Sequence, residues 1–289
     1  MAESEGIYVT VQQIAGIDAG GTMIKIAISD GKKLTLKAFP EREKEHFLEW
    51  LHRNYPEGFI SMTGGGASCL AAQLPERQIQ IVPEFQASCT GVQYLLHQER
   101  GRADPFILTN VGTGTSLHLV KGEKNQRLTG TGVGGGTILG LSALLTGIHD
   151  FSRLMELSLQ GKRAHIDLTV ATVYRGHTPP IPGDLTASNF GNVSEKVKKS
   201  ATANADLIAS VIGLVAETIT TLSVLAAEKE QVHRIVYIGG AFSGNPLLHR
   251  LVRNYSRFCH AEPIIPENGQ FSGAVGALLM QRSLNQTES

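Results

Sequence analysis

Residues 14–28 read IAGIDAGGTMIKIAI, and the pattern of this stretch predicts the first elements of the fold. An apolar run breaks at Asp18, passes through a turn of small residues and resumes as an alternating run. Alternation with a period of two predicts strands, so the stretch predicts a hairpin closed by the turn DAGGT. The same turn could cradle a phosphate, because a backbone without β-carbons lets its N–H groups approach an anion closely. Taken alone, the turn leaves both interpretations open.

Strand and helix patterns alternate outward from this hairpin. A third strand over 33–39 completes a meander, a helix is expected over about 42–54, and Pro83 opens another helix that reaches about 100. The pattern then restarts at 105–122, PFILTNVGTGTSLHLVKG, where Gly114 corresponds to Gly21 at an offset of 93 residues. Such an internal repeat predicts two related halves, each beginning with a hairpin, within an α/β architecture.

Composition excludes several classes of function. The 289 residues include 26 Lys and Arg and 26 Asp and Glu, so no net field draws the chain to nucleic acid or an anionic membrane. Cys69, Cys89 and Cys259 form no CxxC pair, which argues against a disulfide framework, a zinc knuckle or an iron–sulfur site. The N-terminus lacks a leader pattern and no run approaches roughly 18 apolar residues, so we expect a cytoplasmic protein without a membrane span.

Three glycine turns could together bind a nucleotide. Asp18, beside the first turn, becomes useful next to phosphates by holding Mg²⁺ or its waters. The second turn, 110–116, adds hydroxyl donors, and the third, IVYIGGAFSGN at 235–245, suits adenosine or an α-phosphate at a helix N-terminus. The P-loop pattern GxxxxGK[ST] is absent from the sequence, so this would be a different way of binding ATP.

The ordered set DAGGT, VGTGTS and IGGAFSGN resembles the phosphate-1, phosphate-2 and adenosine motifs of the actin, hexokinase and acetate kinase superfamily. Over about residues 14–282 the chain resembles, more narrowly, the type II pantothenate kinases of the bacterial, staphylococcal kind. The motifs that carry this resemblance are GIDAGGTMIKI, TNVGTGTSLH, GTGVGGGTILGL, PPIPGDLTASNFG and ENGQFSGAVGAL.

The resemblance implies a two-domain, actin-like (ribonuclease H-like) fold with a duplicated mixed β-sheet core flanked by helices. We expect one domain over 1–104, with a closing helix at 272–289 packing back near it, and a second over 105–271 with nucleotide and dimer contacts. The implied activity is phosphorylation of pantothenate to 4′-phosphopantothenate by ATP with Mg²⁺, the first step of coenzyme A synthesis. A homodimer is also implied.

The resemblance also assigns roles to individual side chains. Glu84 would accept the hydroxyl proton during in-line attack, although an acidic residue in a helix's first turn is also favoured by the helix dipole. Arg127 would bridge substrate and transferring phosphoryl, unless it is a solvated hairpin arginine. Lys25 would reach the phosphates, unless it is an exposed strand lysine, and Asp18 would hold the metal.

Other positions follow from the same motifs. His118 is taken as the counterpart of Lys25, while Asp184 and Asn189 lie in a shaped loop without an assigned mechanism. The residues expected to contact substrate are Glu84, Thr113, Ser116 and Arg127. The residues expected to contact the nucleotide are Ala19, Gly20, Gly21, Thr22, Lys25, Gly112, Thr113, Gly114, Thr115, Gly134, Gly135, Gly136, Thr137, Gly239, Gly240 and Ser243.

Two rival classes share these motifs. The first rival class is another small-molecule kinase of the superfamily. Glucokinases of the repressor and open-reading-frame group usually carry a cysteine-rich zinc motif and an acidic sugar-binding pair, and neither is visible in this sequence. An ATP-driven conformational protein is the other. A dehydratase activator of that class needs cysteines for an iron–sulfur cluster, which the three separated cysteines do not supply. A chaperone-like ATPase needs a peptide-binding domain, for which no residues remain.

Overall fold

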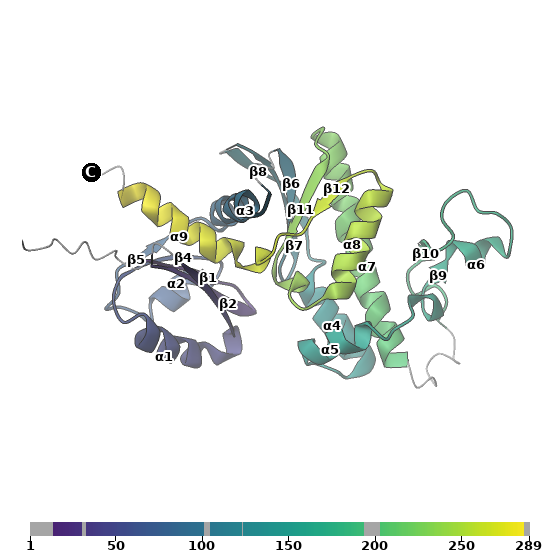
Figure 1. Cartoon of the computed structure of the whole chain (residues 1–289). Helices are drawn as coiled ribbons and strands as arrows, with labels where there is room; N and C mark the ends of the chain where they lie inside the picture. The colour runs from purple at the N-terminus through teal and green to yellow at the C-terminus, as the bar shows by residue number, and fades with distance from the viewer. Residues whose placement is uncertain (1–13, 31–32, 101–104, 123, 194–202, 286–289) are drawn as a thin grey trace, which may run out of the picture. The chain divides into compact units, whose positions relative to one another are not determined.

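The computed structural model describes residues 14–30, 33–100, 105–122, 124–193 and 203–285, and divides into two compact units (Figure 1). Unit 1 comprises Met1–Arg102 with Phe271–Ser289, and unit 2 comprises Ala103–Gln270. The last helix therefore returns to the unit with which the chain begins.

Unit 1 is built on a five-stranded mixed sheet in the order β3-β2-β1-β4-β5. Its strands are β1 (Ile14–Ala19), β2 (Met23–Ser29), β3 (Leu34–Pro40), β4 (Phe59–Thr63) and β5 (Ile79–Ile81). Its helices are η1 (Glu41–Glu43), α1 (Lys44–Asn54), α2 (Ala67–Ala71), α3 (Glu84–Arg100) and α9 (Ser272–Asn285). The first three strands form the predicted antiparallel meander, and β4 and β5 add parallel strands beside β1.

The central strand β1 is apolar because both of its faces are covered. On one side, Ile17 joins Phe47 and Leu51 of α1 in a buried cluster. On the other, Ile14 packs with Val275 and Leu278 of α9. Burial on two faces explains why β1 is a continuous apolar run rather than an alternating one.

Unit 2 repeats this plan with the sheet order β12-β11-β6-β7-β8. Its strands are β6 (Phe106–Val111), β7 (Thr115–Lys121), β8 (Lys124–Thr131), β11 (Arg234–Ile238) and β12 (Glu262–Ile264). Its larger helices are α4 (Gly135–Thr146), α5 (Phe151–Ser158), α7 (Ala203–Lys229) and α8 (Pro246–Phe258). An excursion between α5 and α7 contains η2 (Arg163–His165), β9 (Leu168–Thr169), α6 (Val170–Tyr174) and β10 (Thr186–Ser188). Short 3-10 turns lie at η4 (Gly240–Phe242) and η5 (Gly269–Phe271).

The two sheets correspond strand by strand, which confirms the predicted duplication, but the predicted offset of 93 residues is wrong on both sides of the turn. Asp18 pairs with Lys25 across the first hairpin, and Asn110 pairs with Ser116 across the second. The offset is 92 residues between Asp18 and Asn110 and 91 residues between Lys25 and Ser116, because the second turn is one residue shorter. Ser116 rather than His118 is the counterpart of Lys25, because His118 pairs with Leu108 deeper in the sheet.

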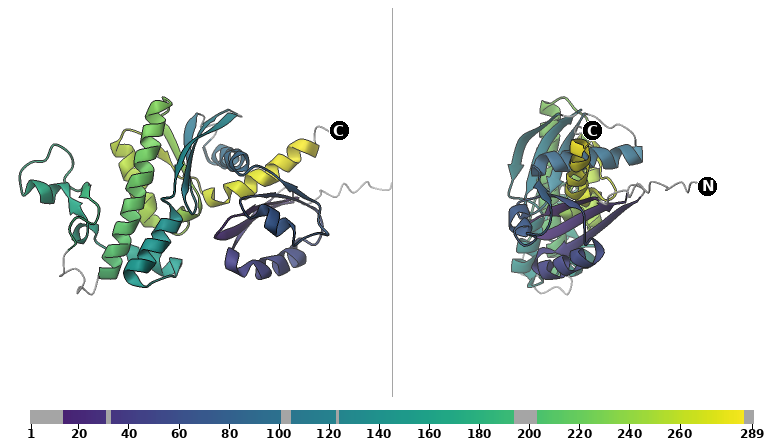
Figure 2. Two further views of the ribbon diagram at one scale, coloured as in Figure 1. Left: turned by 180° about the vertical axis from the view of Figure 1, so that it is seen from behind. Right: turned by 90° about the vertical axis from the view of Figure 1, so that its left-hand side faces the viewer.

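The long helix α7 contradicts the expectation that no segment of the chain is long and apolar enough to cross a membrane. Among the described residues it is the one helix long and apolar enough to cross a membrane by length and composition, with a mean hydropathy of 1.9. However, 67% of that window is buried, and α7 packs against α4, α5 and α8 (Figure 2). A core helix passes the same test, and its burial accounts for its apolar sequence.

Candidate active site

The DAGGT turn of unit 1 is the predicted hairpin. The Gly20 N–H donates to the Met23 carbonyl over 3.0 Å, and the Gly66 N–H donates to the Ala19 carbonyl over 2.9 Å. Gly21 has no left-handed φ, and a β-carbon there would meet nothing within 4 Å. Since the hairpin does not require glycine at this position, the bare backbone leaves space for a ligand to approach.

Asp18 and Lys25 form an ion pair across this hairpin. Lys25 Nζ lies 3.3 Å from Asp18 Oδ2, and only 13% of the lysine side chain and 16% of the aspartate side chain are exposed. Lys25 is therefore not an exposed strand lysine, which rules out that alternative. The pair places one positive and one negative group at the end of the hairpin that holds the glycine turn.

Glu84 is the first residue of α3 and belongs to the same electrostatic environment. Partial desolvation raises the pKa of its carboxyl, and the negative charge of Asp18 raises this pKa further, while Lys25 lowers it. A helix N-terminus favours the ionised form, so the net rise means that desolvation and Asp18 outweigh it here. A surface carboxylate with a raised pKa is suited to accept a proton.

In unit 2, the second glycine turn and the loop before α4 interlock backbone to backbone. Gly135 N–H donates to the Gly112 carbonyl over 2.8 Å, and Gly136 N–H donates to the Thr113 carbonyl over 2.9 Å. A β-carbon on Gly134 would lie 2.8 Å from the Gly114 carbonyl. These glycines therefore serve close packing, and the N–H groups of Gly135 and Gly136 are already used within the chain.

Two threonines that were predicted to contact the nucleotide also have side-chain partners within the chain. Thr115 Oγ1 donates to the Val133 carbonyl over 2.7 Å. Thr137 Oγ1 accepts from the Gly134 N–H at 3.1 Å and donates to the Gly132 carbonyl at 3.2 Å. Both hydroxyls thus fix the shape of the loop at the start of α4.

The third glycine turn meets the second at the end of β6. Gly239 has a φ of 111°, and a β-carbon there would overlap the Val111 carbonyl and lie 2.8 Å from Asn110 Oδ1. Only glycine fits this close approach in a left-handed conformation. The three glycine loops of unit 2 are therefore gathered around the end of one strand.

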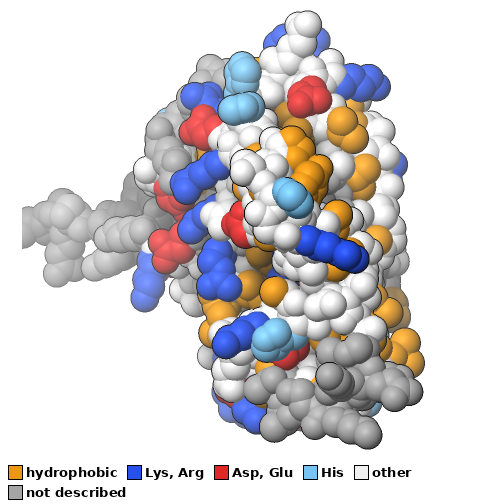
Figure 3. Space-filling model, turned by 90° about the vertical axis from the view of Figure 1, so that its right-hand side faces the viewer, with side chains coloured by type: hydrophobic (Ala, Val, Ile, Leu, Met, Phe, Trp, Pro, Cys, Tyr) orange, Lys and Arg blue, Asp and Glu red, His pale blue; other side chains and the backbone are white. Residues whose placement is uncertain are grey.

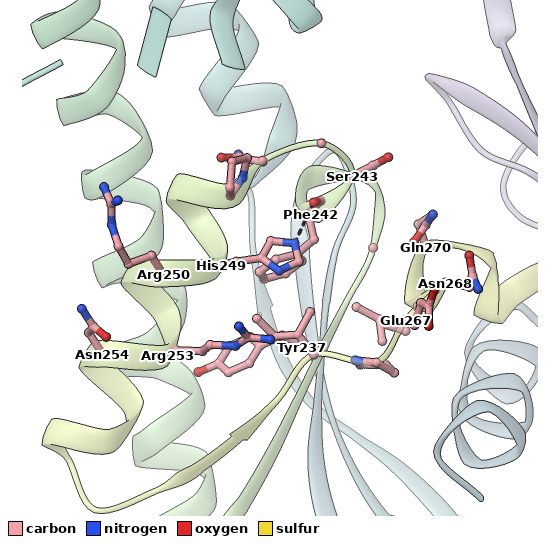
Figure 4. A pocket seen from close by; sticks show the side chains of 18 of the residues that line it. Tyr237, Phe242, Ser243, His249, Arg250, Arg253, Asn254, Glu267, Asn268 and Gln270 are labelled. Carbon is pink, nitrogen blue, oxygen red and sulfur yellow. Dashed lines mark hydrogen bonds between the residues drawn. The ribbon is translucent and has the colours of Figure 1, made fainter. Parts of the chain in front are cut away.

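A pocket of about 670 Å³ opens beside this third turn (Figure 4). Its walls come from the turn, from α8 and from the loop after β12, which includes Glu267 and Asn268. His249 lies in it, with Nε2 2.8 Å from the Phe242 carbonyl. A carbonyl only accepts, so Nε2 carries the proton and Nδ1 remains an acceptor. Burial lowers the pKa of His249, and nearby Arg253 lowers it further.

Arg127 and His118 lie opposite each other on β8 and β7. The guanidinium of Arg127 lies along Gly130, where a β-carbon would be 2.8 Å from Nη2. His118 is 1% exposed and its Nε2 is 3.2 Å from Ser116 Oγ. Burial, with a contribution from Arg127, lowers the pKa of His118 to about 4. His118 is therefore neutral near pH 7, and Arg127 supplies the positive charge.

A polar network around Arg163 and Glu217 is not predicted by the sequence analysis. Arg163 Nη2 lies 2.6 Å from Glu217 Oε1 on α7, and Arg163 Nε lies 2.8 Å from Asp167 Oδ2. Thr186, Asn189 and Tyr255 also hydrogen-bond to Glu217. Burial opposes ionisation of Glu217, yet the hydrogen bonds from Tyr255 and Arg163 outweigh it and lower its pKa. The network ties the excursion, including Asn189, to α7 and α8.

The donor set in unit 1 fits magnesium better than a transition metal. Within the described ranges no group of three or more His, Cys, Asp or Glu side chains could hold a metal ion. Magnesium often binds through one or two carboxylates and takes its other ligands from phosphates and water. The single carboxylate of Asp18 beside a glycine turn matches that requirement.

Comparison with solved structures defines the class of fold. The activator of 2-hydroxyisocaproyl-CoA dehydratase from Clostridium difficile, solved with bound ADPNP, has a TM-score of 0.64 and 17% identity, covering 96% of this chain and 98% of that one. A glucokinase of the ROK family from Streptomyces griseus, in complex with glucose and AMPPNP, has a TM-score of 0.56 and 12% identity, covering 94% and 99%. At these identities the likeness shows the fold alone: an actin-like fold shared by kinases and ATPases.

Sequence comparison then identifies the family. The Fumble family model matches residues 22–280. A type II pantothenate kinase of Bacillus cereus is 42% identical over 272 residues, covering 93% of this chain and 98% of the relative. One from Staphylococcus saprophyticus is 41% identical over 263 residues, covering 91% and 98%. The chain belongs to the Fumble family, among the type II pantothenate kinases.

Proposed function

We propose that this chain transfers the γ-phosphoryl group of ATP to the primary hydroxyl of pantothenate, giving 4′-phosphopantothenate and ADP. Family membership over nearly the whole chain supports the substrate. The observation that carries the chemistry is the position of Glu84 at the start of α3, with the charges of Asp18 and Lys25 near enough to shift its pKa. A carboxylate of this kind can take the proton that the alcohol loses as it attacks.

The proposed step is an in-line displacement. The pantothenate hydroxyl oxygen forms a bond to the γ-phosphorus, the bond from that phosphorus to the bridging oxygen breaks, and ADP leaves. Glu84 accepts the hydroxyl proton. Arg127, with Ser116 on the neighbouring strand, binds the substrate and offsets charge on the transferring group.

The glycine turns would bind the nucleotide. We assign phosphate contacts to the turns at residues 19–22 and 112–115 and the adenosine to the pocket beside Gly239, Gly240 and Ser243. Lys25 would contact the phosphates, and Asp18 would hold Mg²⁺ directly or through water. When bound, magnesium neutralises charge on the β- and γ-phosphates.

Consumption of ATP, measured with and without pantothenate, tests this assignment in three proteins. Wild type and Glu49→Gln, which alters an exposed acid on α1, should consume ATP only with pantothenate. Glu84→Gln should be slower by roughly 10²–10⁴-fold, the usual contribution of a general base. Full activity of Glu84→Gln would refute its role, and equal consumption without pantothenate would refute the substrate.

We also propose a cytoplasmic homodimer that binds neither nucleic acid nor membrane. Charged and hydrophobic side chains are intermixed on the face drawn in Figure 3. Large hydrophobic side chains are exposed on α4 and on the excursion, among them Leu144 at 84%, Val173 at 49% and Ile181 at 47%. Light scattering should give twice the monomer mass, and Leu144→Glu or Ile181→Glu should lower it if these positions form the contact.

A further inference from the structure

Each oxygen of the Asp18 carboxylate faces a glycine from a distant part of unit 1. A β-carbon on Gly64, in the loop after β4, would lie 2.8 Å from Asp18 Oδ1. A β-carbon on Gly273, in the first turn of α9, would lie 2.8 Å from Oδ2 and 2.9 Å from Cγ. Both separations are shorter than carbon–oxygen or carbon–carbon van der Waals contact, so neither position accepts a side chain while Asp18 stays in place.

Gly64 has additional reasons to be glycine. Its φ is 93°, in the left-handed region, and its β-carbon would also lie 2.6 Å from the Ala19 carbonyl oxygen. A substitution there would disturb the backbone as well as Asp18. Gly64 therefore cannot isolate the effect on the carboxylate.

Gly273 is different because the closest obstruction to a side chain there is Asp18. Its φ is outside the left-handed region, and the three atoms nearest to its would-be β-carbon all belong to the Asp18 side chain. Gly273 is the second residue of α9, and because its φ is not left-handed the backbone itself does not require glycine here. Gly276 on the same helix contrasts with it, since a β-carbon there would overlap the Ala87 backbone of α3.

We infer that Gly273 is a positioning residue that fixes where the Asp18 carboxylate lies, with Gly64 closing the opposite side. The ion pair with Lys25 uses Oδ2, the same oxygen that Gly273 faces. A methyl group at residue 273 would push that oxygen away, disturbing the ion pair and the direction in which the carboxylate is presented. This inference rests on the proposed role of Asp18 toward Mg²⁺ and nucleotide, and it adds the group that sets the geometry.

The test uses the full chain and binding of AMPPNP, measured by calorimetry with Mg²⁺ and with EDTA. Wild type should bind more tightly with Mg²⁺. Gly273→Ala should bind like wild type in EDTA and lose about 10-fold or more of the affinity gained with Mg²⁺, as for other residues that orient metal ligands. In the Asp18→Asn background, Gly273→Ala should change the affinity less than 2-fold, because the carboxylate is already lost.

Thermal unfolding without ligand separates positioning from packing. Gly140→Ala, at an exposed helix position where a β-carbon meets nothing within 4 Å, sets the gain expected from an unobstructed substitution. Gly273→Ala should instead lower the melting temperature, because its methyl group meets Asp18. The same substitution in the Asp18→Ala background then shows whether contact with Asp18 causes this loss. Stability regained there supports the contact, and stability not regained overturns the inference.

The possible failures are distinguishable. If wild type gains affinity with Mg²⁺ and Gly273→Ala gains as much, the positioning role is wrong and the proposed function stands. If wild type itself gains nothing with Mg²⁺, the proposed metal role of Asp18 fails, and the inference about Gly273 fails with it.

Discussion

Asn110 occupies in unit 2 the position that Asp18 occupies in unit 1. Each is the fifth residue of its six-residue strand, the two strands have the same pattern of burial, and each residue pairs with the strand after the turn. The partners are Lys25 for Asp18 and Ser116 for Asn110. The duplicated hairpin therefore presents an ion pair in one unit and a neutral pair in the other, which is why the proposed metal site is in unit 1.

Asp18→Asn gives unit 1 the asparagine that unit 2 has at the equivalent position, and it leaves Lys25 without its anion. The fold should remain intact, because the equivalent strand of unit 2 accommodates asparagine at this point. Turnover should fall by at least about 10²-fold, since removing one group that stabilises transition-state charge typically costs that much. Steady-state rates across a range of Mg²⁺ concentrations, together with circular dichroism, measure both effects. Wild-type turnover at ordinary Mg²⁺ would contradict the assignment.

The pH dependence of kcat/KM should report Glu84. A base must be deprotonated, so activity should rise with pH through the pKa of Glu84, which lies above 4.5. Lys25→Met should move this limb to higher pH, because Lys25 lowers the pKa, and Asp18→Asn should move it to lower pH, because Asp18 raises the pKa. Shifts in the opposite directions would show that another group controls the limb.

Glu84→Gln should fold at least as stably as wild type. The folded state binds the Glu84 proton more tightly than the unfolded state, so this residue lowers stability as pH rises above 4.5. Removing the charge removes that cost. Urea denaturation at pH 7 measures it, and a clear loss of stability in Glu84→Gln would assign Glu84 a structural role instead.

His118 should make the fold sensitive to mild acid. Its pKa falls from 6.5 to about 4 on folding, so the unfolded chain binds the extra proton first between these values. Stability should therefore decrease as pH falls from 6.5 toward 4, by up to about 3 kcal/mol. Urea denaturation at pH 7 and pH 5 should show a smaller difference in His118→Gln, whereas His97→Gln, at an exposed position on α3, should behave like wild type. An unchanged pH difference in His118→Gln would contradict this account.

Arg163 should contribute strongly to the stability of the folded state. Arg163→Leu leaves the carboxylates of Asp167 and Glu217 without their cation, and Asp167 is 1% exposed. Breaking such a pair should cost about 3–5 kcal/mol in the free energy of unfolding. The exposed pair of Arg153 and Glu156 provides the control, because Arg153→Leu should cost less than about 1 kcal/mol. Equal losses in the free energy of unfolding for the two variants would show that the Arg163 network stabilises the fold no more than an exposed ion pair does.

Much of the fold is predictable because it depends on local patterns. Turn residues between alternating runs fix the meander, and glycine clusters mark the ends of β1, β6 and β11. The register of the second hairpin is not predictable this way, because the glycine motifs align at an offset of 93 residues, whereas the strands correspond at 92 before the turn and at 91 after it. Sequence spacing cannot report a turn that is one residue shorter.

The site is predictable where its residues are neighbours in sequence. The hairpin that pairs Asp18 with Lys25 is contained in a single motif. Arg163 and Glu217 are 54 residues apart and lie on elements whose packing depends on the whole unit. The roles of Gly135 and Gly136 in loop packing likewise appear only once the carbonyls of Gly112 and Thr113 are in place.

Identifying the phosphorylated product tests the proposed kinase activity most directly. Purified protein with ATP, Mg²⁺ and pantothenate should yield 4′-phosphopantothenate and ADP in equal amounts, detected by mass spectrometry, and without pantothenate ADP should accumulate far more slowly. Release of inorganic phosphate at the same rate with or without pantothenate, and with no phosphorylated pantothenate, would show that the chain is not a pantothenate kinase.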